Sequence, residues 1–220
     1  MADIEVPEGV EVEDPRPIAK ANPYTFFMPH AAELAALAPG DAVKAIFRQV
    51  ADETEYEAER MWVLIDGIED GVVTGTLGNE PAGMDRIGQG DRVRIPLSHA
   101  IGTSFHKDHL RPDVPQEPEF WDRCLVDACV IEGRSRIDYL YREEPDMARA
   151  GDRYPDSGWR IRGTEEAMEE DEKRGARPKY VALGKVLNVD DSWLHLVDRA
   201  PSCAFRWDPE SETYAEVHLP

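Results

Sequence analysis

Cysteine is scarce in this sequence, and its spacing argues against the common cysteine-based sites. The chain has three cysteines, Cys124, Cys129 and Cys203, and no two of them form a C-x-x-C pair. An odd number without that spacing does not suit a disulfide framework or a zinc ribbon. We therefore expect all three to be small buried hydrophobic residues. The alternative is a redox or metal-binding role, or a reactive Cys124 thiolate beside a histidine that folding brings close.

Long hydrophobic runs are also missing. No apolar stretch approaches the roughly 20 residues that a membrane-spanning helix needs. The opening residues, MADIEVPEGVEVED, contain neither the basic region nor the apolar core of a secretion signal. These two absences predict a cytoplasmic protein without a membrane partner. Apolar residues still make up 41% of the chain, which is enough for a packed core.

Positive charge is in short supply. The chain has 45 acidic residues against 25 basic ones, for a formal net charge of −20. The excess is shared, because residues 23–110 hold 14 acids and 7 bases and residues 124–220 hold 21 acids and 14 bases. Neither half is a basic module of the kind that binds nucleic acid, and anionic lipid is repelled for the same reason. The charge predicts a basic partner protein instead.

The usual signatures of catalysis and cofactor binding are absent as well. The sequence has no G-x-x-x-x-G-K-[ST] phosphate loop. Gly88 and Gly90 lack the third glycine of a dinucleotide-binding turn. Gly102 and Ser104 lack the closing glycine of a nucleophile elbow. We therefore predict a non-enzymatic protein without a cofactor.

Two small clusters could in principle bind a metal ion. His106 and His109 are three residues apart and would share one face of a helix, with His99 as a distant third candidate. Asp190 and Asp191 could bind a hard cation. The simpler interpretation is that the histidines lie on the surface and the aspartates cap a short helix. No metal site is therefore predicted.

The composition along the chain predicts two folded units. Residues 1–22 hold six acids, two bases and three prolines with few large apolar groups, which is typical of a mobile acidic tail. A first unit is expected over residues 23–110 and a second over residues 121–220. Residues 111–120, RPDVPQEPEF, contain three prolines and are the best candidate for a linker.

The first unit is expected to be mostly β. Residues 29–38 predict one short helix, which Pro39 and Gly40 would end. Asp70 and Gly71 predict a tight turn between two strands. Together the strands predict a small curved sheet or an SH3-like barrel. The expected strands are residues 43–50, 61–65, 72–77 and 93–97.

The second unit is expected to be an α+β domain. Its pattern predicts an antiparallel or mixed sheet of about five strands with short helices on one face. Asp190 and Asp191 predict the start of a short helix over residues 192–197, and an acidic tail is expected after residue 207. The expected strands are residues 124–131, 137–142, 159–162, 180–189 and 203–207.

An acidic segment follows the third of these strands. Residues 165–172 contain six carboxylates, and Thr164 and Gly175 are typical of the start and the end of a helix. The acids therefore predict the solvated face of a weakly anchored helix. On the preceding strand, Arg160 and Arg162 alternate with apolar residues and predict a wet face. The alternative is that this charged region contacts a partner.

Two parts of the chain resemble known bacterial families. Residues 59–95 contain M-W-V at 61–63, G-T-L-G-N-E-P at 75–81 and G-D-R-V at 90–93, which resembles a family catalogued only as a domain of unknown function. Residues 124–207 resemble the family of bacterial toxin-immunity proteins that is numbered thirty-three. The second resemblance is carried by Y-R-E-E-P at 141–145, D-S-G-W-R at 156–160, N-V-D-D-S-W-L at 188–194 and A-F-R at 204–206.

The resemblance implies a protein that neutralises a toxin without catalysis, since neither family brings catalytic residues. An acidic protein can be steered to the basic cleft of a toxin that acts on nucleic acid. The alternatives are a small-ligand or regulatory module and an enzyme with an unrecognised metal or cysteine site. The residues predicted to bind the partner are Trp159, Arg160, Arg162, Glu165, Glu166, Glu169, Glu170, Asp190 and Asp191.

Overall fold

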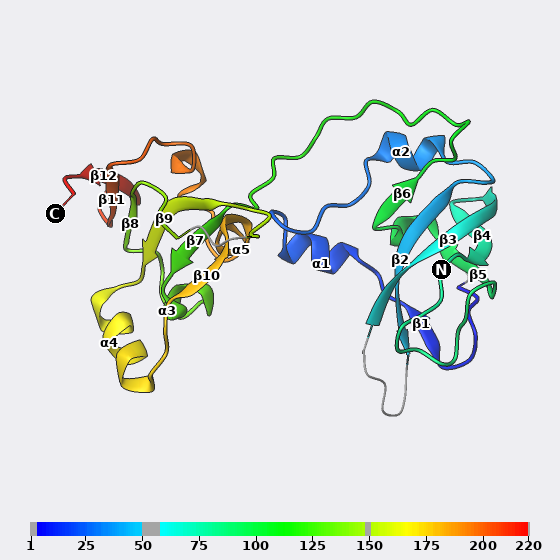
Figure 1. The fold of residues 1–220 in the computed structure, drawn as a ribbon, viewed down its shortest axis with the longest axis horizontal. Coiled ribbons are helices and arrows are strands. Elements are labelled where there is room, and N and C mark those ends of the chain that lie inside the picture. Colours follow the sequence, from blue (N-terminus) through cyan, green and yellow to red (C-terminus); the bar gives the residue numbers. More distant parts are fainter. Residues whose placement is uncertain (1–3, 50–57, 148–150, 220) are drawn as a thin grey trace. The chain divides into compact units, whose positions relative to one another are not determined.

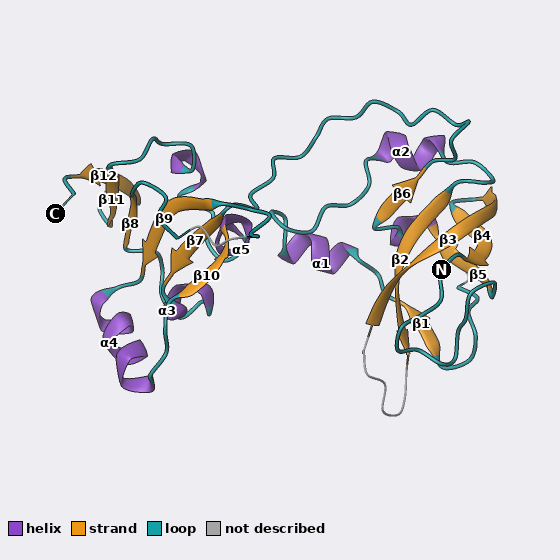
Figure 2. Ribbon diagram, in the orientation of Figure 1, coloured by secondary structure: helices purple, strands orange, loops and turns teal. Residues whose placement is uncertain are grey.

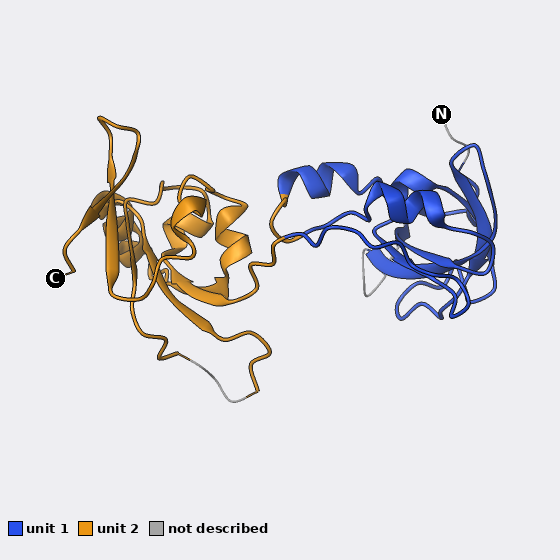
Figure 3. Ribbon diagram, turned by 90° about the horizontal axis from the view of Figure 1, so that it is seen from above, with its two compact units in different colours: residues 1–21, 26–117 blue, residues 22–25, 118–220 orange. Residues whose placement is uncertain are grey.

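The chain folds into two units. The computed structural model describes three stretches, residues 4–49, 58–147 and 151–219. Unit 1 comprises Met1–Ala21 and Phe26–Glu117, and unit 2 comprises Asn22–Thr25 and Pro118–Pro220 (Figure 3). The chain therefore passes between the units three times. We expected a single linker over residues 111–120, because no local signal showed that four residues near position 22 pack with the second unit.

Unit 1 is the predicted small curved sheet, a nearly closed antiparallel barrel. Its strands are β1 (Val10–Val12), β2 (Ala42–Gln49), β3 (Ala58–Glu69), β4 (Val72–Leu77), β5 (Arg92–Pro96) and β6 (Gly102–Ser104). They follow the order β1-β2-β3-β4-β5, and β6 also pairs with β2 (Figure 1). Asp70 and Gly71, both at positive φ, form the predicted turn between β3 and β4. Its helical elements are α1 (Arg16–Ala21), α2 (Ala31–Ala36) and the 3-10 turn η1 (Leu97–His99).

The N-terminal segment closes this barrel. Glu5 and Arg94 exchange two backbone hydrogen bonds of 2.9 and 2.7 Å, which attach the segment to β5. Val10 and Val12 then pair with β2 on the other side of the opening, and both valines are buried in the core. The prediction of a mobile tail is therefore wrong for this part of the segment. The average composition of residues 1–22 does not reveal that two valines alternate with Glu11. Nor does it reveal that the edges of β2 and β5 are open to pair with this segment.

Replacing Val12 with alanine is expected to lower the free energy of unfolding of unit 1 by about 1.5–2.5 kcal/mol. Two buried methyl groups are lost and a cavity is left behind. Glu11→Ala, on the same strand but exposed, is the matched control and is expected to change stability by less than about 0.5 kcal/mol. Urea denaturation followed by hydrogen exchange measures the free energy of unfolding of both variants. Equal and negligible effects would show that the segment does not close the barrel.

Unit 2 is a six-stranded mixed sheet with short helices. Its strands are β7 (Arg123–Val126), β8 (Tyr139–Arg142), β9 (Asp156–Arg162), β10 (Lys179–Ala182), β11 (Cys203–Asp208) and β12 (Thr213–Val217). Its helical elements are α3 (Ala128–Ile131), α4 (Glu165–Arg174), α5 (Leu183–Leu187) and the 3-10 turn η2 (Leu194–Leu196). The order is β10-β7-β9-β8-β11-β12, in which β7 and β9 are parallel and the other pairs antiparallel (Figure 2). The predicted α+β class with about five strands is confirmed.

Four element predictions in unit 2 were wrong in detail. The strands expected over residues 124–131 and 180–189 each end early, and the chain continues as α3 and α5. Most apolar residues of both stretches are buried, and a short apolar run does not distinguish a buried strand from a buried helix. The acidic tail expected after residue 207 instead forms β12, which pairs with β11. The helix expected over residues 192–197 is the shorter 3-10 turn η2.

The sheet of unit 2 has one covered face and one outer face. Leu140 and Phe205 belong to the core, together with apolar residues of α3, α5 and η2. Side chains alternate along a strand, and directly paired residues share a face. The pairing of Tyr139 with Arg162 and with Arg206 therefore places these three residues on the opposite face. Among the described residues, no helix has the length and apolar character needed to span a bilayer.

Candidate functional site

Helix α4 forms where local chemistry predicted it. The Thr164 hydroxyl accepts a hydrogen bond from the Ala167 N–H at the start, and Gly175 ends the helix in the left-handed conformation. Acidic residues in its first turn and basic residues in its last turn both complement the helix dipole. Four predicted site residues lie exposed on it, Glu165, Glu166, Glu169 and Glu170.

One of the six acids anchors the helix. Asp171 is buried and accepts a 2.7 Å hydrogen bond from the backbone N–H of Cys129, at the start of α3. It also forms a short ion pair with Arg134. Burial raises the pKa of Asp171, but the hydrogen bonds from Arg134 and Cys129 outweigh it, so the pKa lies below its usual value. The helix is therefore held by a buried carboxylate that the sequence did not distinguish from its solvated neighbours.

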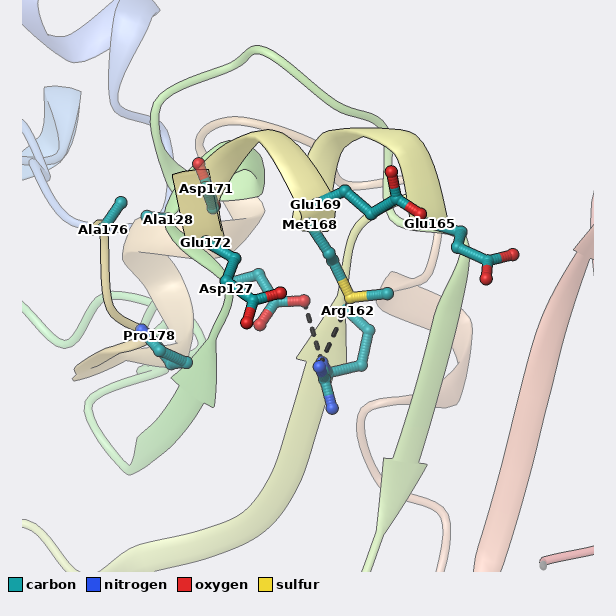
Figure 4. A pocket seen from close by; sticks show the side chains of 10 residues that line it. All are labelled: Asp127, Ala128, Arg162, Glu165, Met168, Glu169, Asp171, Glu172, Ala176 and Pro178. Carbon is teal, nitrogen blue, oxygen red and sulfur yellow. Dashed lines mark hydrogen bonds and ion pairs between the residues drawn. The ribbon is translucent and has the colours of Figure 1, made fainter. Parts of the chain in front are cut away.

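A pocket of about 350 Å³ opens beside α4 (Figure 4). Arg162 lies in it with 44% of its side chain exposed, donates a 2.8 Å hydrogen bond to buried Asp127, and contacts the Met168 sulfur at 3.3 Å. Five carboxylates and one guanidinium line the pocket, and Met168, Pro178 and two alanines form its apolar part. The lining residues are Asp127, Ala128, Arg162, Glu165, Met168, Glu169, Asp171, Glu172, Ala176 and Pro178. The pocket therefore combines surplus negative charge with apolar side chains, and two of its carboxylates, Asp127 and Asp171, are buried.

Arg160 does not lie on a wet face, contrary to the prediction. Its side chain is 4% exposed, and all five of its N–H donors are used. It binds both oxygens of Asp156, one oxygen each of Glu143 and Asp146, and the backbone carbonyl of Trp159. Alternation along β9 suggested exposure, but three carboxylates from the strand and the preceding loop enclose the guanidinium. Arg160 is therefore no part of an exposed contact surface.

Trp159 is likewise excluded from any contact surface. It is fully buried, and its ring centroid lies 5.5 Å from that of Trp193 in an edge-to-face arrangement. Its indole N–H donates to the Val197 carbonyl at 3.0 Å. A buried tryptophan usually needs such a partner, and this one therefore serves the core of unit 2.

Asp190 and Asp191 belong to a different part of unit 2. Asp190 accepts hydrogen bonds from the Ser192 N–H and hydroxyl in a local turn and does not cap η2, whose N-cap residue is Trp193. Asp191 accepts a 2.7 Å hydrogen bond from the Tyr24 hydroxyl. Together with Asn188, which bonds the Tyr24 N–H at 2.9 Å, it holds residues 22–25 on unit 2. Figure 1 shows the adjoining turn η2 (orange) and α4 (yellow) at opposite ends of this unit, so the predicted site residues do not form one surface.

The residues considered for catalysis are held by other contacts. His109 Nδ1 lies 2.7 Å from buried Asp41, and the side chain of His106 pairs with Asp108 at 3.5 Å. Burial raises the pKa of the Cys124 thiol well above its usual range and that of Cys129 to about 11, which disfavours a thiolate nucleophile. Within residues 4–49, 58–147 and 151–219, no group of three or more His, Cys, Asp or Glu side chains could hold a metal ion.

The sequence could have pointed to one of the two missed carboxylates, Asp127, but not to Asp171. Asp127 interrupts an apolar run, and a lone acid there signals a buried, paired carboxylate. It accepts hydrogen bonds from Arg162 and from the Gly163 N–H. Nothing in the order of residues marks Asp171, since its partner Cys129 lies 42 positions away.

The motifs that carried the family resemblance have structural roles. In D-S-G-W-R, Asp156 and Arg160 form the buried ion pair, and Gly158 has a φ of +82°. A Cβ at Gly158 would lie 2.1 Å from the Glu143 carbonyl oxygen, so glycine is required. In the first unit, the side-chain oxygen of Asn79 accepts the Trp62 N–H at 2.8 Å. These residues therefore define two folds, and they do not define a reactive centre.

The fold and this surface define a two-domain, mostly β protein whose second domain presents an exposed acidic helix. Residues 124–218 match the family described as the immunity protein Imm33 domain, and residues 30–104 match an uncharacterized protein family conserved in bacteria, DUF2314. The chain therefore carries an N-terminal DUF2314 domain and a C-terminal Imm33 immunity protein domain. Comparison with curated proteins and with solved structures gave no match.

Proposed function

We propose that this protein binds and neutralises a toxin protein, without catalysis, through the exposed face of α4 and the pocket beside it. The match of unit 2 to the Imm33 immunity domain is the observation that carries the proposal. The surface supports it, because Glu165 and Glu166 form no ion pair with any described residue. Unpaired carboxylates on a stable helix are available to a basic partner.

The partner is expected to be a basic protein that the α4 carboxylates attract over a distance. With a net charge of −20, the chain favours encounter with a positive surface and repels nucleic acid. A toxin that acts on nucleic acid needs a positive cleft, and α4 presents the complementary charge. Of the predicted contact residues, Arg162, Glu165, Glu166, Glu169 and Glu170 make up this surface, whereas Asp190 and Asp191 do not.

Co-expression of this protein with the genes that adjoin its own, to find one whose product is toxic, tests the function. We expect the protein to restore growth of cells that produce the toxin, and to form a complex with it that weakens at high salt. The proposal is contradicted if no neighbouring gene product is toxic. It is also contradicted if this protein binds the toxin no more tightly than serum albumin binds it.

Reversing the charge of Glu169 and Glu170 with the double substitution Glu169→Lys and Glu170→Lys is expected to slow association with that toxin about tenfold at low salt. Both side chains are more than 60% exposed, so folding should be unaffected. The effect should shrink as salt screens the charges. Stopped-flow association rates at two ionic strengths measure it.

The matched control reverses Glu210 and Glu212, two exposed acids in the turn between β11 and β12. This variant has the same net charge, so it separates a local contact from a general field. Equal slowing by the two double variants would mean that only the overall charge matters. No slowing by the α4 variant would remove α4 from the contact surface.

A further inference from the structure

Two tyrosines and an arginine form an aromatic row on the outer face of the sheet in unit 2. The ring centroids of Tyr139 and Tyr141 lie 5.6 Å apart, and the guanidinium of Arg206 lies 5.2 Å from the Tyr139 ring. Arg206 has 60% of its side chain exposed. The helices α3 and α5 pack on the other face of the sheet, so this row is not part of the core. We call Tyr139, Tyr141 and Arg206 the aromatic row.

The tyrosines of the aromatic row have free polar ends. Neither hydroxyl forms a hydrogen bond with residues in the described stretches of the chain. Tyrosine and arginine are the side chains that most often dominate the free energy of protein–protein binding, because they bury much area with little loss of conformational freedom. The two tyrosines with free hydroxyls, together with Arg206, which also pairs with Asp138 at 3.7 Å, therefore have the composition of a binding centre beside an exposed charged surface.

The aromatic row is continuous with the α4 pocket. Arg162 pairs directly with Tyr139 across the strands β9 and β8, so the two side chains are neighbours on one face. Arg162 also lines the pocket, where it contacts Met168 (Figure 4). Arg162 thus connects the carboxylates and apolar side chains of the pocket to the two aromatic rings.

We propose that this surface recognises an arginine side chain of the partner protein, with the aromatic row providing most of the binding free energy. A guanidinium can pair with the exposed carboxylates of the pocket and stack on a tyrosine ring, while its aliphatic stem lies on apolar side chains such as Met168. Two arginines of the chain already make such contacts. Arg206 stacks on Tyr139, and Arg162 pairs with Asp127 against Met168.

This inference rests on the proposed function and assigns separate tasks to the two parts of the surface. The α4 carboxylates act at long range, so they set the association rate and its salt dependence. The aromatic row acts only on contact, so it sets the dissociation rate. Changes in Tyr139 and Tyr141 should therefore weaken binding by a factor that does not depend on salt.

The test uses the full chain and a blocked peptide of sequence Gly-Arg-Leu-Arg-Gly, with the lysine peptide Gly-Lys-Leu-Lys-Gly for comparison. Amide shifts of the labelled protein are expected to change at Tyr139, Tyr141 and Arg162 when the arginine peptide is added. The double substitution of both tyrosines with leucine keeps apolar bulk in the strand and should weaken this binding at least tenfold at low and at high salt. The lysine peptide should bind the unsubstituted protein several-fold less tightly, since ammonium groups stack less well on aromatic rings.

Tyr154→Leu is the matched control, because Tyr154 is another partly exposed tyrosine of unit 2 that stacks on Trp121 instead. It should leave peptide binding unchanged. The inference is overturned by an absence of binding at millimolar peptide, by shifts confined to other surfaces, by equal affinity for both peptides, or by unaltered binding in the double variant. Whether the unsubstituted protein neutralises the toxin is measured separately. If it does while the peptide test fails, the proposed function stands and only this inference is overturned.

Discussion

Replacing Asp156 with asparagine is expected to destabilise unit 2 by about 3–5 kcal/mol, the range found when one partner of a buried ion pair is removed. The Asp156 side chain is fully buried, and both of its oxygens bind Arg160, which is itself 4% exposed. The substitution leaves the guanidinium in place with its principal counter-charge removed. Urea denaturation followed by the fluorescence of the buried tryptophans measures the change.

Asp146→Asn is the matched control for this prediction. Asp146 binds the same guanidinium at 2.9 Å, but 72% of its side chain is exposed. Because water screens and replaces an exposed partner, the expected loss is below about 1 kcal/mol. Similar losses in the two variants would mean that the burial of Asp156 has no energetic consequence.

The same ion pair gives unit 2 a predictable response to acid. Burial raises the pKa of Asp156, but the hydrogen bonds from Arg160 and from the Gly158 and Met147 N–H groups outweigh it and place the pKa below its usual value. A carboxyl with a lowered folded-state pKa stabilises the protein above its unfolded pKa, and this contribution is lost as the pH falls. Unit 2 should therefore lose stability below about pH 4, and the Asp156→Asn variant should lose less in that window.

Gly75→Ala is expected to destabilise unit 1 by about 3 kcal/mol. A Cβ at this position would lie 2.1 Å from the Leu64 carbonyl oxygen on the neighbouring strand. Backbone cannot rotate away as a side chain does, so β3 and β4 must separate, and the cost falls in the upper part of the range for overpacking. Hydrogen exchange of the β3–β4 amides across a urea series measures the loss.

Gly67→Ala provides the comparison within the same strand pair. Gly67 follows the irregularity in β3, and a Cβ there would have no atom within 4 Å. Alanine costs less conformational entropy on folding than glycine, so this variant should be neutral or slightly stabilised. If both alanine variants unfold alike, the close approach at Gly75 does not govern the stability of the barrel.

Features governed by neighbouring residues could be predicted from the sequence. The turn at Asp70 and Gly71 and the start and end of α4 at Thr164 and Gly175 follow from short-range chemistry. Alternating and apolar runs also predicted most strands and the division into two β-rich units. Short, mostly apolar runs over residues 124–131 and 180–189 gave the wrong element in part, because both a buried strand and a buried helix fit such a run.

The candidate site could be predicted only in part, because some of its residues are placed by neighbours along the chain and others by distant partners. The exposed glutamates of α4 follow from a charge run on a helix, and Arg162 follows from strand alternation. Asp171 and Arg160 look equally exposed in the sequence, yet both are buried by partners that folding brings to them. The aromatic row was missed because Tyr139 and Arg206 are adjacent only through the pairing of β8 with β11.

By itself the sequence determined the composition of this protein: two apolar-cored units with surplus negative charge, and an acidic helix with its own start and end signals. The tertiary structure alone decided which charges are buried, that Val10 and Val12 close a barrel, and that Tyr24 belongs to unit 2 through Asn188, 164 positions away. The physical reason is that pairing across a sheet and burial of a charge depend on contacts between distant residues. Periodicity and local propensity record only the neighbours along the chain.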